Sequence, residues 1–149
     1  MKKDLLSCMD ITRADFERII SLAAELKEGR GKPGAPKPFE GKSVGMIFAK
    51  SSTRTRVSFE VGIFELGGHP VYLDQSRTQM GRGETVPDTA RVLERYLSGI
   101  VIRTFAQQDL IDLAANAHIP IINALTDDFH PCQALTDMFT MYELSLIHI

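Results

Sequence analysis

The fold is decided by the stretch Val44-Gly45-Met46-Ile47-Phe48-Ala49-Lys50-Ser51-Ser52-Thr53-Arg54-Thr55-Arg56-Val57-Ser58-Phe59. Its first six residues form a nearly unbroken apolar run, which is typical of a strand buried on both faces of a parallel sheet. Apolar residues then recur at helical spacing as far as Gly67-Gly68, which indicates a helix with a wide apolar face. The chain therefore passes from a buried strand into a helix through a short polar turn.

This turn carries hydroxyl side chains, one lysine and two arginines, and it has no carboxylate. The first turn of a helix has unpaired N–H groups and partial positive charge, so it normally attracts Asp or Glu. Arginine is unfavourable there unless an anion binds, and a phosphate would satisfy the amides, the hydroxyls and a guanidinium together. The turn fits a phosphate site, and it equally fits an ordinary Ser/Thr N-cap with surface arginines.

The two arginines of the turn lie two residues apart, so they point to roughly opposite faces of the helix. Arg54 is nearer the start of the helix, and we expect it to meet the anion. Arg56 stands four residues before Glu60, and we expect a plain ion pair between these two side chains.

The composition is typical of a soluble globular chain: 149 residues suit one domain, with 44% apolar and 24% charged residues. A net charge of −2 argues against a general nucleic-acid or membrane binder. Cys8 and Cys132 lack the spacing of a zinc site or a disulfide framework, so no metal is expected and a reduced cytosolic setting fits. No run is long enough for a membrane span or a signal peptide. Nucleophile–base–acid, HExxH and Walker patterns are missing too, which disfavours covalent, zinc and nucleotide chemistry.

Periodicity predicts an alternation of strands and helices along the chain. Beyond the strand and helix within 43–66, strands are expected at 69–73, 100–102 and 119–124, and helices at 12–29, 87–98, 110–117 and 131–142. A loop rich in proline and glycine is expected at 30–41, and a polar, locally basic loop at 74–84. Regular alternation with short links predicts an α/β fold with a parallel four-stranded sheet flanked by helices.

Polar features follow each of the four predicted strands. The turn at 51–56 follows the first strand, the loop containing Gln79 follows the second, and Arg103 and His130 follow the third and fourth. Ligands of parallel sheets gather beyond the carboxyl ends of the strands, so these features are expected along one edge. Taken singly, Arg103 could be a solvated arginine, the segment with Gln79 a plain loop, and His130 a helix cap. Gln133 could be an ordinary surface residue. Taken together, they favour an anion site.

The chain resembles the carbamoyltransferases in five segments, in that order and spacing. These are residues 52–56, 79–85 and 88–93, Arg103, and His130-Pro131-Cys132-Gln133. The first segment marks both the aspartate and the ornithine branches of that family, whereas the glutamine-bearing loop and the last segment resemble the ornithine branch. The resemblance covers nearly the whole chain and implies that residues 1–143 are a carbamoyl-phosphate-binding domain.

The resemblance also implies which residues bind carbamoyl phosphate, namely Ser52, Thr53, Arg54, Thr55, Gln79, Arg103, His130 and Gln133. The first four would hold the phosphate, and Gln79 would reach it from a neighbouring subunit of a trimer. Arg103, His130 and Thr55 would be catalytic: Arg103 would bridge the phosphate and the carbonyl oxygen, which the other two would polarise. Gln133 would fix the carbamoyl amino group.

In the implied reaction, the neutral side-chain amine of ornithine attacks the carbonyl carbon, phosphate leaves and citrulline forms. No metal or organic cofactor is implied. Both stages concentrate negative charge, so preorganised donors and the alignment of two substrates are the expected catalytic devices. The resemblance implies a cytoplasmic enzyme of arginine biosynthesis or catabolism that is a homotrimer when full length.

The sequence departs from the family in its length and its end. Family members are much longer, so we expect that the ornithine-binding half is absent and that ornithine binds only with that half. Residues 144–149 do not resemble the family and are interpreted as a truncation or a non-native tail. Because the acceptor residues would lie in the missing half, aspartate, putrescine or an acylated ornithine remain alternative acceptors. A non-catalytic anion-binding fragment is a further alternative.

Overall fold

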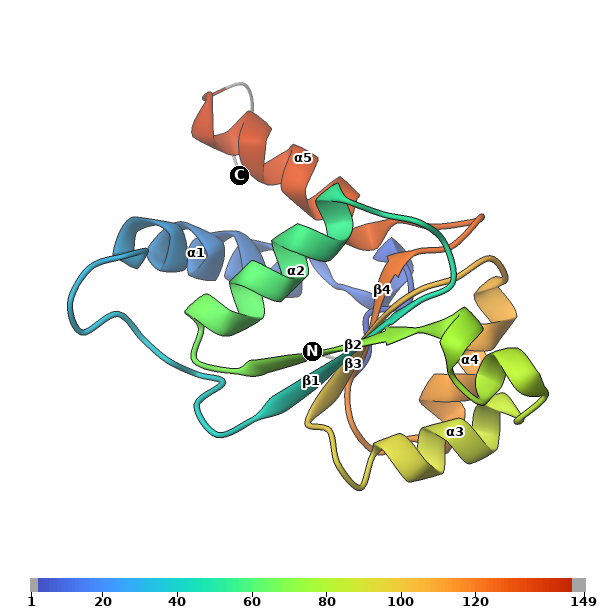
Figure 1. Cartoon of the computed structure of the whole chain (residues 1–149). Coiled ribbons are helices and arrows are strands. Elements are labelled where there is room, and N and C mark those ends of the chain that lie inside the picture. The colour runs from blue at the N-terminus through green and yellow to red at the C-terminus, as the bar shows by residue number, and fades with distance from the viewer. Residues whose placement is uncertain (1–2, 146–149) are drawn as a thin grey trace.

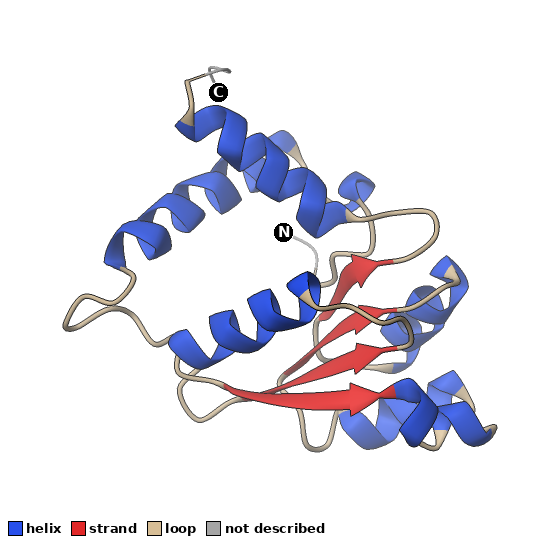
Figure 2. Ribbon diagram, turned by 45° about the horizontal axis from the view of Figure 1, so that its top comes forward, coloured by secondary structure: helices blue, strands red, loops and turns tan. Residues whose placement is uncertain are grey.

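The computed structural model describes residues 3–145, which contain a four-stranded sheet with helices on both sides (Figures 1 and 2). The strands are β1 (Ser43–Phe48), β2 (His69–Asp74), β3 (Gly99–Arg103) and β4 (Ile121–Leu125). They lie in the order β2-β1-β3-β4, and each neighbouring pair is parallel. The predicted α/β fold with a parallel four-stranded sheet is confirmed.

Five α-helices of the described chain flank this sheet. Helices α1 (Arg13–Gly29), α2 (Arg54–Glu65) and α5 (Pro131–Glu143) lie on one side, and α3 (Val86–Leu93) and α4 (Gln107–Asn116) lie on the other (Figure 2). Short 3-10 turns are formed by η1 (Cys8–Asp10), η2 (Gln75–Arg77) and η3 (Met80–Arg82). Because α2 follows β1 and α5 follows β4, both helices begin at the carboxyl edge of the sheet.

Local sequence signals explain where the helices begin and end. Thr12 and Asp15 form a capping box at the start of α1: the Thr12 side chain accepts the backbone N–H of Asp15, and the Asp15 carboxylate accepts the backbone N–H of Thr12. Pro131 is the first residue of α5, a position where the missing N–H of proline costs nothing. Gly67 follows α2 with a φ of 89°, a left-handed conformation that glycine adopts without strain.

The core fills both sides of the sheet. Between the sheet and helices α3 and α4 lie Ile47, Ala90, Leu97, Ile100, Ile102, Leu110, Leu113, Ala117 and Ile121. A smaller cluster of Met46, Phe48 and Ile63 lies beneath α2. Burial of a large apolar side chain contributes about 1.5–3 kcal/mol relative to exposure. This packing holds β1 and β3 in register, and it places Phe48 opposite Arg103 at the carboxyl edge.

The N-terminal segment forms an addition to the sheet that periodicity does not predict. Leu5 makes a parallel bridge with Ile122, and its N–H donates to the carbonyl oxygen of Ile121 over 2.9 Å. The N–H of Asn123 donates in turn to the carbonyl oxygen of Leu5 over 2.8 Å. The segment therefore covers the outer edge of β4, where unpaired backbone groups would otherwise face solvent.

Several sequence-based boundaries are wrong in detail. The helix expected at 87–98 ends at Leu93, and a turn follows it. The strand expected at 119–124 begins at Ile121, because Pro120 has no N–H to donate to the ladder. The helix expected at 110–117 begins at Gln107. The loop expected at 74–84 holds η2 and η3, and it packs on the domain because Met80 contacts the core.

Two apolar helix faces are only partly covered within the described residues. On α2, Ile63 is buried, whereas Val57 and Phe64 are 52% and 71% exposed. On α5, Tyr142 is 43% exposed, as expected for a stripe that is partly uncovered. Of the predicted tail, residues 144 and 145 follow α5, and residues 146–149 lie outside the described part. Among the described helices, none has the length and apolarity to cross a membrane.

Candidate functional site

The loops that follow β1, β3 and β4 are joined at the carboxyl edge of the sheet. The N–H of Ala49 donates to the carbonyl oxygen of Arg103 over 2.8 Å, and the N–H of Asp127 donates to that of Phe105 over 2.9 Å. These bonds bring together the loops that carry the predicted phosphate residues, Arg103 and His130. The expectation that these features share one edge is confirmed for these three strands.

The start of α2 is open to an anion. The N-cap residue Thr53 makes no side-chain capping bond, and the first turn contains no acidic residue. Arg54 is exposed, and within residues 3–145 its guanidinium makes no hydrogen bond or ion pair. Unpaired first-turn amides beside an unpaired guanidinium are the groups that a phosphate would engage.

Arg103 reaches this turn from the end of β3. Its Nη1 donates to the Thr55 hydroxyl over 3.1 Å, and its Nε is buried without a partner among the described residues. Buried donors normally have partners, so an unpaired guanidinium N–H is a position where a ligand acceptor would be stabilised. Arg103 and Thr55 therefore present donors to the same small volume.

Arg56 points the other way, as predicted. Its Nε donates to Glu60 over 3.2 Å, and its guanidinium lies 3.6 Å from the centroid of the Tyr72 ring on β2. The ion pair between Arg56 and Glu60 is confirmed. The cation–π contact additionally holds this side chain against the edge strand of the sheet.

His130 is the N-cap of α5, and its ring is held in one orientation. Nδ1 accepts the backbone N–H of Gln133 over 3.4 Å, so in the neutral ring the proton resides on Nε2. Partial burial, and then the positive charge of Arg103, lower the pKa of His130 from its ordinary value, and the opposing effect of Asp137 is smaller. The ring is therefore neutral near pH 7, and Nε2–H is a hydrogen-bond donor.

Gln133 lies in the first turn of the same helix. Its side-chain Nε2 donates to Asp137 Oδ1 over 2.8 Å. Cys132, between these site residues, donates through Sγ to the carbonyl oxygen of Asn123 over 3.3 Å. Burial raises the pKa of the Cys132 thiol to about 11, so this thiol stays protonated and is not an activated nucleophile.

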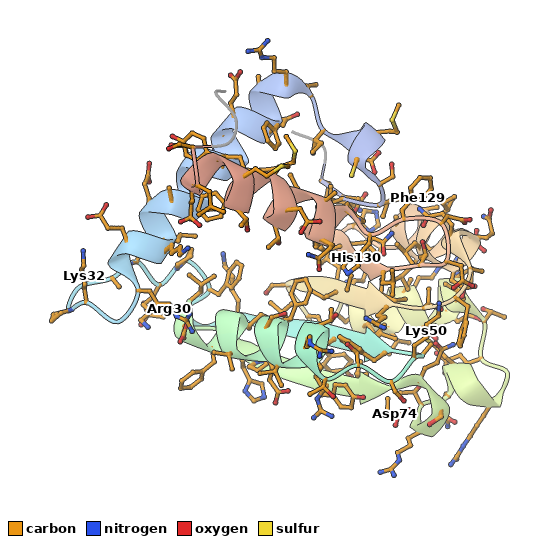
Figure 3. All side chains as sticks on the ribbon, turned by 90° about the horizontal axis from the view of Figure 1, so that it is seen from above. Arg30, Lys32, Lys50, Asp74, Phe129 and His130 are labelled. Carbon is orange, nitrogen blue, oxygen red and sulfur yellow. The ribbon has the colours of Figure 1, made fainter. Side chains whose placement is uncertain are left out.

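Sequence reasoning missed the contacts of Lys50. Its ammonium pairs with Asp127 in the loop after β4 and lies 4.4 Å from the centroid of the Phe105 ring in the loop after β3. Figure 3 shows Lys50 and His130 at the same end of the molecule. Lys50 therefore ties together the three loops of the site. Its position beside the phosphate motif was the one available signal, because its partners are remote in sequence.

Gln79 is not brought to the other predicted residues within the described chain. It is exposed in the segment after β2, where it lines a separate pocket of about 180 Å³ with Met80 and Thr89. Glu84 closes that segment by accepting the Thr89 hydroxyl over 2.8 Å. Gln79 is therefore an exposed residue of this domain, apart from the other predicted site residues.

A groove of about 990 Å³ lies elsewhere, between the end of α1 and α2. Figure 3 labels Arg30 and Lys32 there, at the far end of α2 from Lys50. Its cations already have partners: Arg30 pairs with Glu65, Lys27 pairs with Glu143, and Lys37 donates to the backbone carbonyl oxygen of Glu65. The unpaired donors at the carboxyl edge are therefore the better anion site.

The candidate site is built from donors rather than metal ligands. No group of three or more His, Cys, Asp or Glu side chains in the described part of the chain could hold a metal ion. Ser52, Thr53, Arg54 and Thr55 instead lie at the start of α2, Arg103 contacts Thr55, and the neutral His130 caps α5 after the neighbouring strand. This arrangement can bind a phosphate and stabilise negative charge that develops on an adjacent oxygen.

Comparisons with known proteins point to the same chemistry. Residues 3–143 match the family described as aspartate/ornithine carbamoyltransferase, carbamoyl-P binding domain. The ornithine carbamoyltransferase of Syntrophus aciditrophicus is 54% identical over 143 residues, which are 96% of this chain and 47% of that protein. That of Pelobacter propionicus is 51% identical over 143 residues, with the same coverage.

Solved structures are similar over the same region. The ornithine carbamoyltransferase from Pyrococcus furiosus superposes with a TM-score of 0.90 at 47% identity, covering 96% of this chain and 46% of that chain. The enzyme from Burkholderia thailandensis gives a TM-score of 0.89 at 44% identity, covering 95% of this chain and 49% of that chain. The chain spans about half the length of the curated relatives it matches.

Proposed function

Because this chain belongs to the aspartate/ornithine carbamoyltransferase family through its carbamoyl-P binding domain, we propose that it is the carbamoyl-phosphate-binding half of an ornithine carbamoyltransferase. The observation that carries this proposal is the Arg103–Thr55 pair beside the uncapped first turn of α2. That pair places cationic and hydroxyl donors where a phosphate and a neighbouring carbonyl oxygen would bind together.

The phosphate would be held at the start of α2 by Ser52, Thr53, Arg54 and Thr55. Arg103 would reach both the phosphate and the carbonyl oxygen, since it has a buried N–H without a described partner in addition to its bond to Thr55. Gln133 would receive the carbamoyl amino group. The exposed position of Gln79 supports a role in the site of a neighbouring subunit of a homotrimer, rather than in its own.

The reaction begins when the neutral side-chain amine of ornithine attacks the carbonyl carbon and forms a C–N bond. The carbonyl π electrons move to oxygen, and the resulting oxyanion would accept hydrogen bonds from Arg103, the His130 Nε2–H and the Thr55 hydroxyl. When the carbonyl re-forms, the C–O bond to phosphate breaks, phosphate leaves with its electron pair, and the attacking nitrogen loses a proton. Each donor aimed at the oxyanion is worth about 2.7–4 kcal/mol in such reactions.

His130 suits this role because it is neutral. A neutral ring donates its Nε2 proton as a hydrogen bond without adding another positive charge beside Arg103. The lowered pKa of His130 keeps the ring in that form near pH 7. The proposed chemistry uses no metal or organic cofactor, because the donors are all side chains of the chain.

The acceptor and the cellular setting are also part of the proposal. The relatives are named ornithine carbamoyltransferases, and this supports ornithine as the acceptor, bound with a second half that corresponds to the remainder of those proteins. The proposed enzyme acts in the cytoplasm in arginine biosynthesis or catabolism. We expect the full-length enzyme, with both halves, to form citrulline from carbamoyl phosphate and ornithine. We expect it to form no product from carbamoyl phosphate with aspartate or putrescine.

Calorimetric titration of the chain with carbamoyl phosphate tests the site itself. Arg103→Ala should weaken binding about 10- to 100-fold, because a hydrogen bond to a charged group contributes about 1.5–3 kcal/mol. Arg91→Ala is the matched control, since Arg91 pairs with Asp88 and Asn116 on the opposite side of the sheet. No binding by the unaltered chain, or equal losses in both variants, would contradict the proposed function.

A further inference from the structure

Gln133 and Asp137 lie one turn apart on α5, and Gln133 Nε2 donates to Asp137 Oδ1 over 2.8 Å. An ionised carboxylate can only accept hydrogen bonds, so it selects the NH₂ end of the amide. The other end of the amide, Oε1, is consequently directed away from Asp137. The two ends of a glutamine amide have similar shapes, but the NH₂ end donates hydrogen bonds and the Oε1 end accepts them. The contact with Asp137 occupies the NH₂ end, so Gln133 offers an acceptor to any other partner.

This amide belongs to the same helical turn as His130. The backbone N–H of Gln133 donates to His130 Nδ1 over 3.4 Å, which ties the two residues together. The negative charge of Asp137 also acts on His130. It raises the pKa of the ring, although burial and Arg103 together lower that pKa by more. The Gln133–Asp137 pair is therefore close to the residues that would polarise the carbonyl oxygen.

A carbamoyl group presents two kinds of polar atom to such a site. Its carbonyl oxygen accepts, and the donors Arg103 and His130 suit it. Its amino group donates two N–H bonds and needs an acceptor, which neither a guanidinium nor the Nε2–H of a neutral histidine can supply. Gln133 Oε1 is an acceptor in the same turn as His130, provided that the amide does not rotate by 180° and present its NH₂ group instead.

We propose that Asp137 is a positioning residue that determines specificity: it holds the Gln133 amide with Oε1 toward the carbamoyl amino group. The site thereby selects carbamoyl phosphate over acyl phosphates that carry a methyl group in place of the amino group. This inference rests on the function proposed above. Asp137 itself does not touch the substrate and acts through Gln133.

The chain contains a matched pair outside the site. On α4, Gln108 Nε2 donates to Asp112 Oδ1 over 2.7 Å with the same four-residue spacing, and Gln108, like Gln133, is exposed. Such pairs stabilise a helix by about 0.2–0.5 kcal/mol wherever they occur. Loss of either pair should therefore have the same small effect on the helix, whereas only the pair on α5 should affect substrate choice.

The experiment compares the affinities of the chain for carbamoyl phosphate and for acetyl phosphate, in which a methyl group replaces the amino group. Removal of a negative charge strengthens the binding of both dianions alike, so the ratio of the two affinities isolates the amino-group contact. Asp137→Ala should lower this preference by about two- to tenfold, the range for one hydrogen bond. Asp137→Glu, which keeps an acceptor-only group, should retain most of the preference, and Asp112→Ala should leave it unchanged.

A second background shows whether Asp137 acts through Gln133. Gln133→Ala should lower the preference by itself, and Asp137→Ala should then have no further effect. Three outcomes would overturn the role of Asp137 and leave the proposed function standing. The preference for carbamoyl phosphate over acetyl phosphate could survive Asp137→Ala, or it could fall equally in Asp112→Ala. It could also fall again when Asp137→Ala is added to Gln133→Ala. Failure of the folded, unaltered chain to bind carbamoyl phosphate overturns the proposed function and the role of Asp137 with it.

Discussion

Arg103 Nη1 donates to the hydroxyl of Thr55 over 3.1 Å, although 48 residues separate them in sequence. The bond exists because β1 and β3 are adjacent and parallel, so that the end of one strand meets the helix that follows the other. In the proposed site it joins a guanidinium that would neutralise the phosphate to a hydroxyl that would serve the adjacent carbonyl oxygen. Parallel pairing of two buried strands is thus the physical origin of the site.

The first prediction concerns the two arginines of α2. Arg54→Ala should weaken carbamoyl phosphate binding about 10- to 100-fold, because it removes a charge-assisted contact worth about 1.5–3 kcal/mol. Arg56→Ala should change the affinity much less, since Arg56 faces Glu60 and Tyr72. Calorimetry on both variants, each shown to be folded by circular dichroism, measures the difference. Equal losses would sink the assignment of the phosphate to Arg54.

The second prediction concerns pH. The folded chain lowers the pKa of His130 below its ordinary value of 6.5, so the unfolded chain binds this proton more readily. The stability contributed by the neutral ring is present above pH 6.5 and is lost as the pH falls through 6.5 toward the lower, folded pKa. His130→Asn keeps a capping side chain and removes the titration, so its unfolding free energy should fall less than that of the unaltered chain between pH 7.5 and 5.5.

Urea unfolding at a series of pH values measures this difference, and other titrating groups cancel when the two proteins are compared. His69→Asn, at an exposed histidine on β2, is the control and should keep the pH dependence of the unaltered chain. Parallel stability curves for His130→Asn and the unaltered chain would show that the neutral ring contributes nothing to the fold.

The third prediction concerns the link that Lys50 makes between loops. Lys50→Met keeps the aliphatic stem and removes the ammonium that pairs with Asp127 and lies over Phe105. It should lower the unfolding free energy by about 0.5–2 kcal/mol, the sum of a partly exposed ion pair and a cation–π contact. It should also weaken carbamoyl phosphate binding, because the phosphate loop would no longer be tied to the loops of Arg103 and His130.

Lys27→Met is the matched control, because Lys27 also pairs with a carboxylate, that of Glu143, and lies 5.6 Å from the centroid of the Phe139 ring. It should lower stability comparably and leave the affinity for carbamoyl phosphate unchanged. Denaturant unfolding and calorimetry on both variants separate the two effects. Equal affinity in Lys50→Met and the unaltered chain would exclude the proposed link between loop position and binding.

Much of the fold could be predicted because each element carries its own local signal. The buried strand at 43–48 is a short apolar run, and Thr12 and Pro131 mark helix starts by chemistry that depends on nearby residues alone. The gathering of Arg103 and His130 at one edge followed from the parallel sheet. The bridge of Leu5 to β4 was missed because a single bridge has no periodicity.

Contacts between remote side chains could not be predicted in the same way. Lys50 and Asp127 are 77 residues apart, and nothing near either residue indicates the other. The apolar face of α2 shows a related limit: its spacing predicts a helix, but not that Phe64 remains exposed while Ile63 is buried. Patterns in one segment specify its conformation, whereas the identity of a tertiary partner depends on the whole topology.

The pairing of the N-terminal segment with β4 has a consequence for biosynthesis. Asn123 Nδ2 donates to the carbonyl oxygen of Leu6 across 117 residues, so the segment around Leu6 cannot dock until β4 has been synthesised. Until then the segment has no edge on which to dock, and the β1–β3 pair lacks its outer neighbour. Closure of so long a loop carries a large entropic cost, which makes this contact a late event. Until β4 has been synthesised, the nascent chain therefore carries an unpaired strand edge, and during that interval it is most exposed to association with other chains.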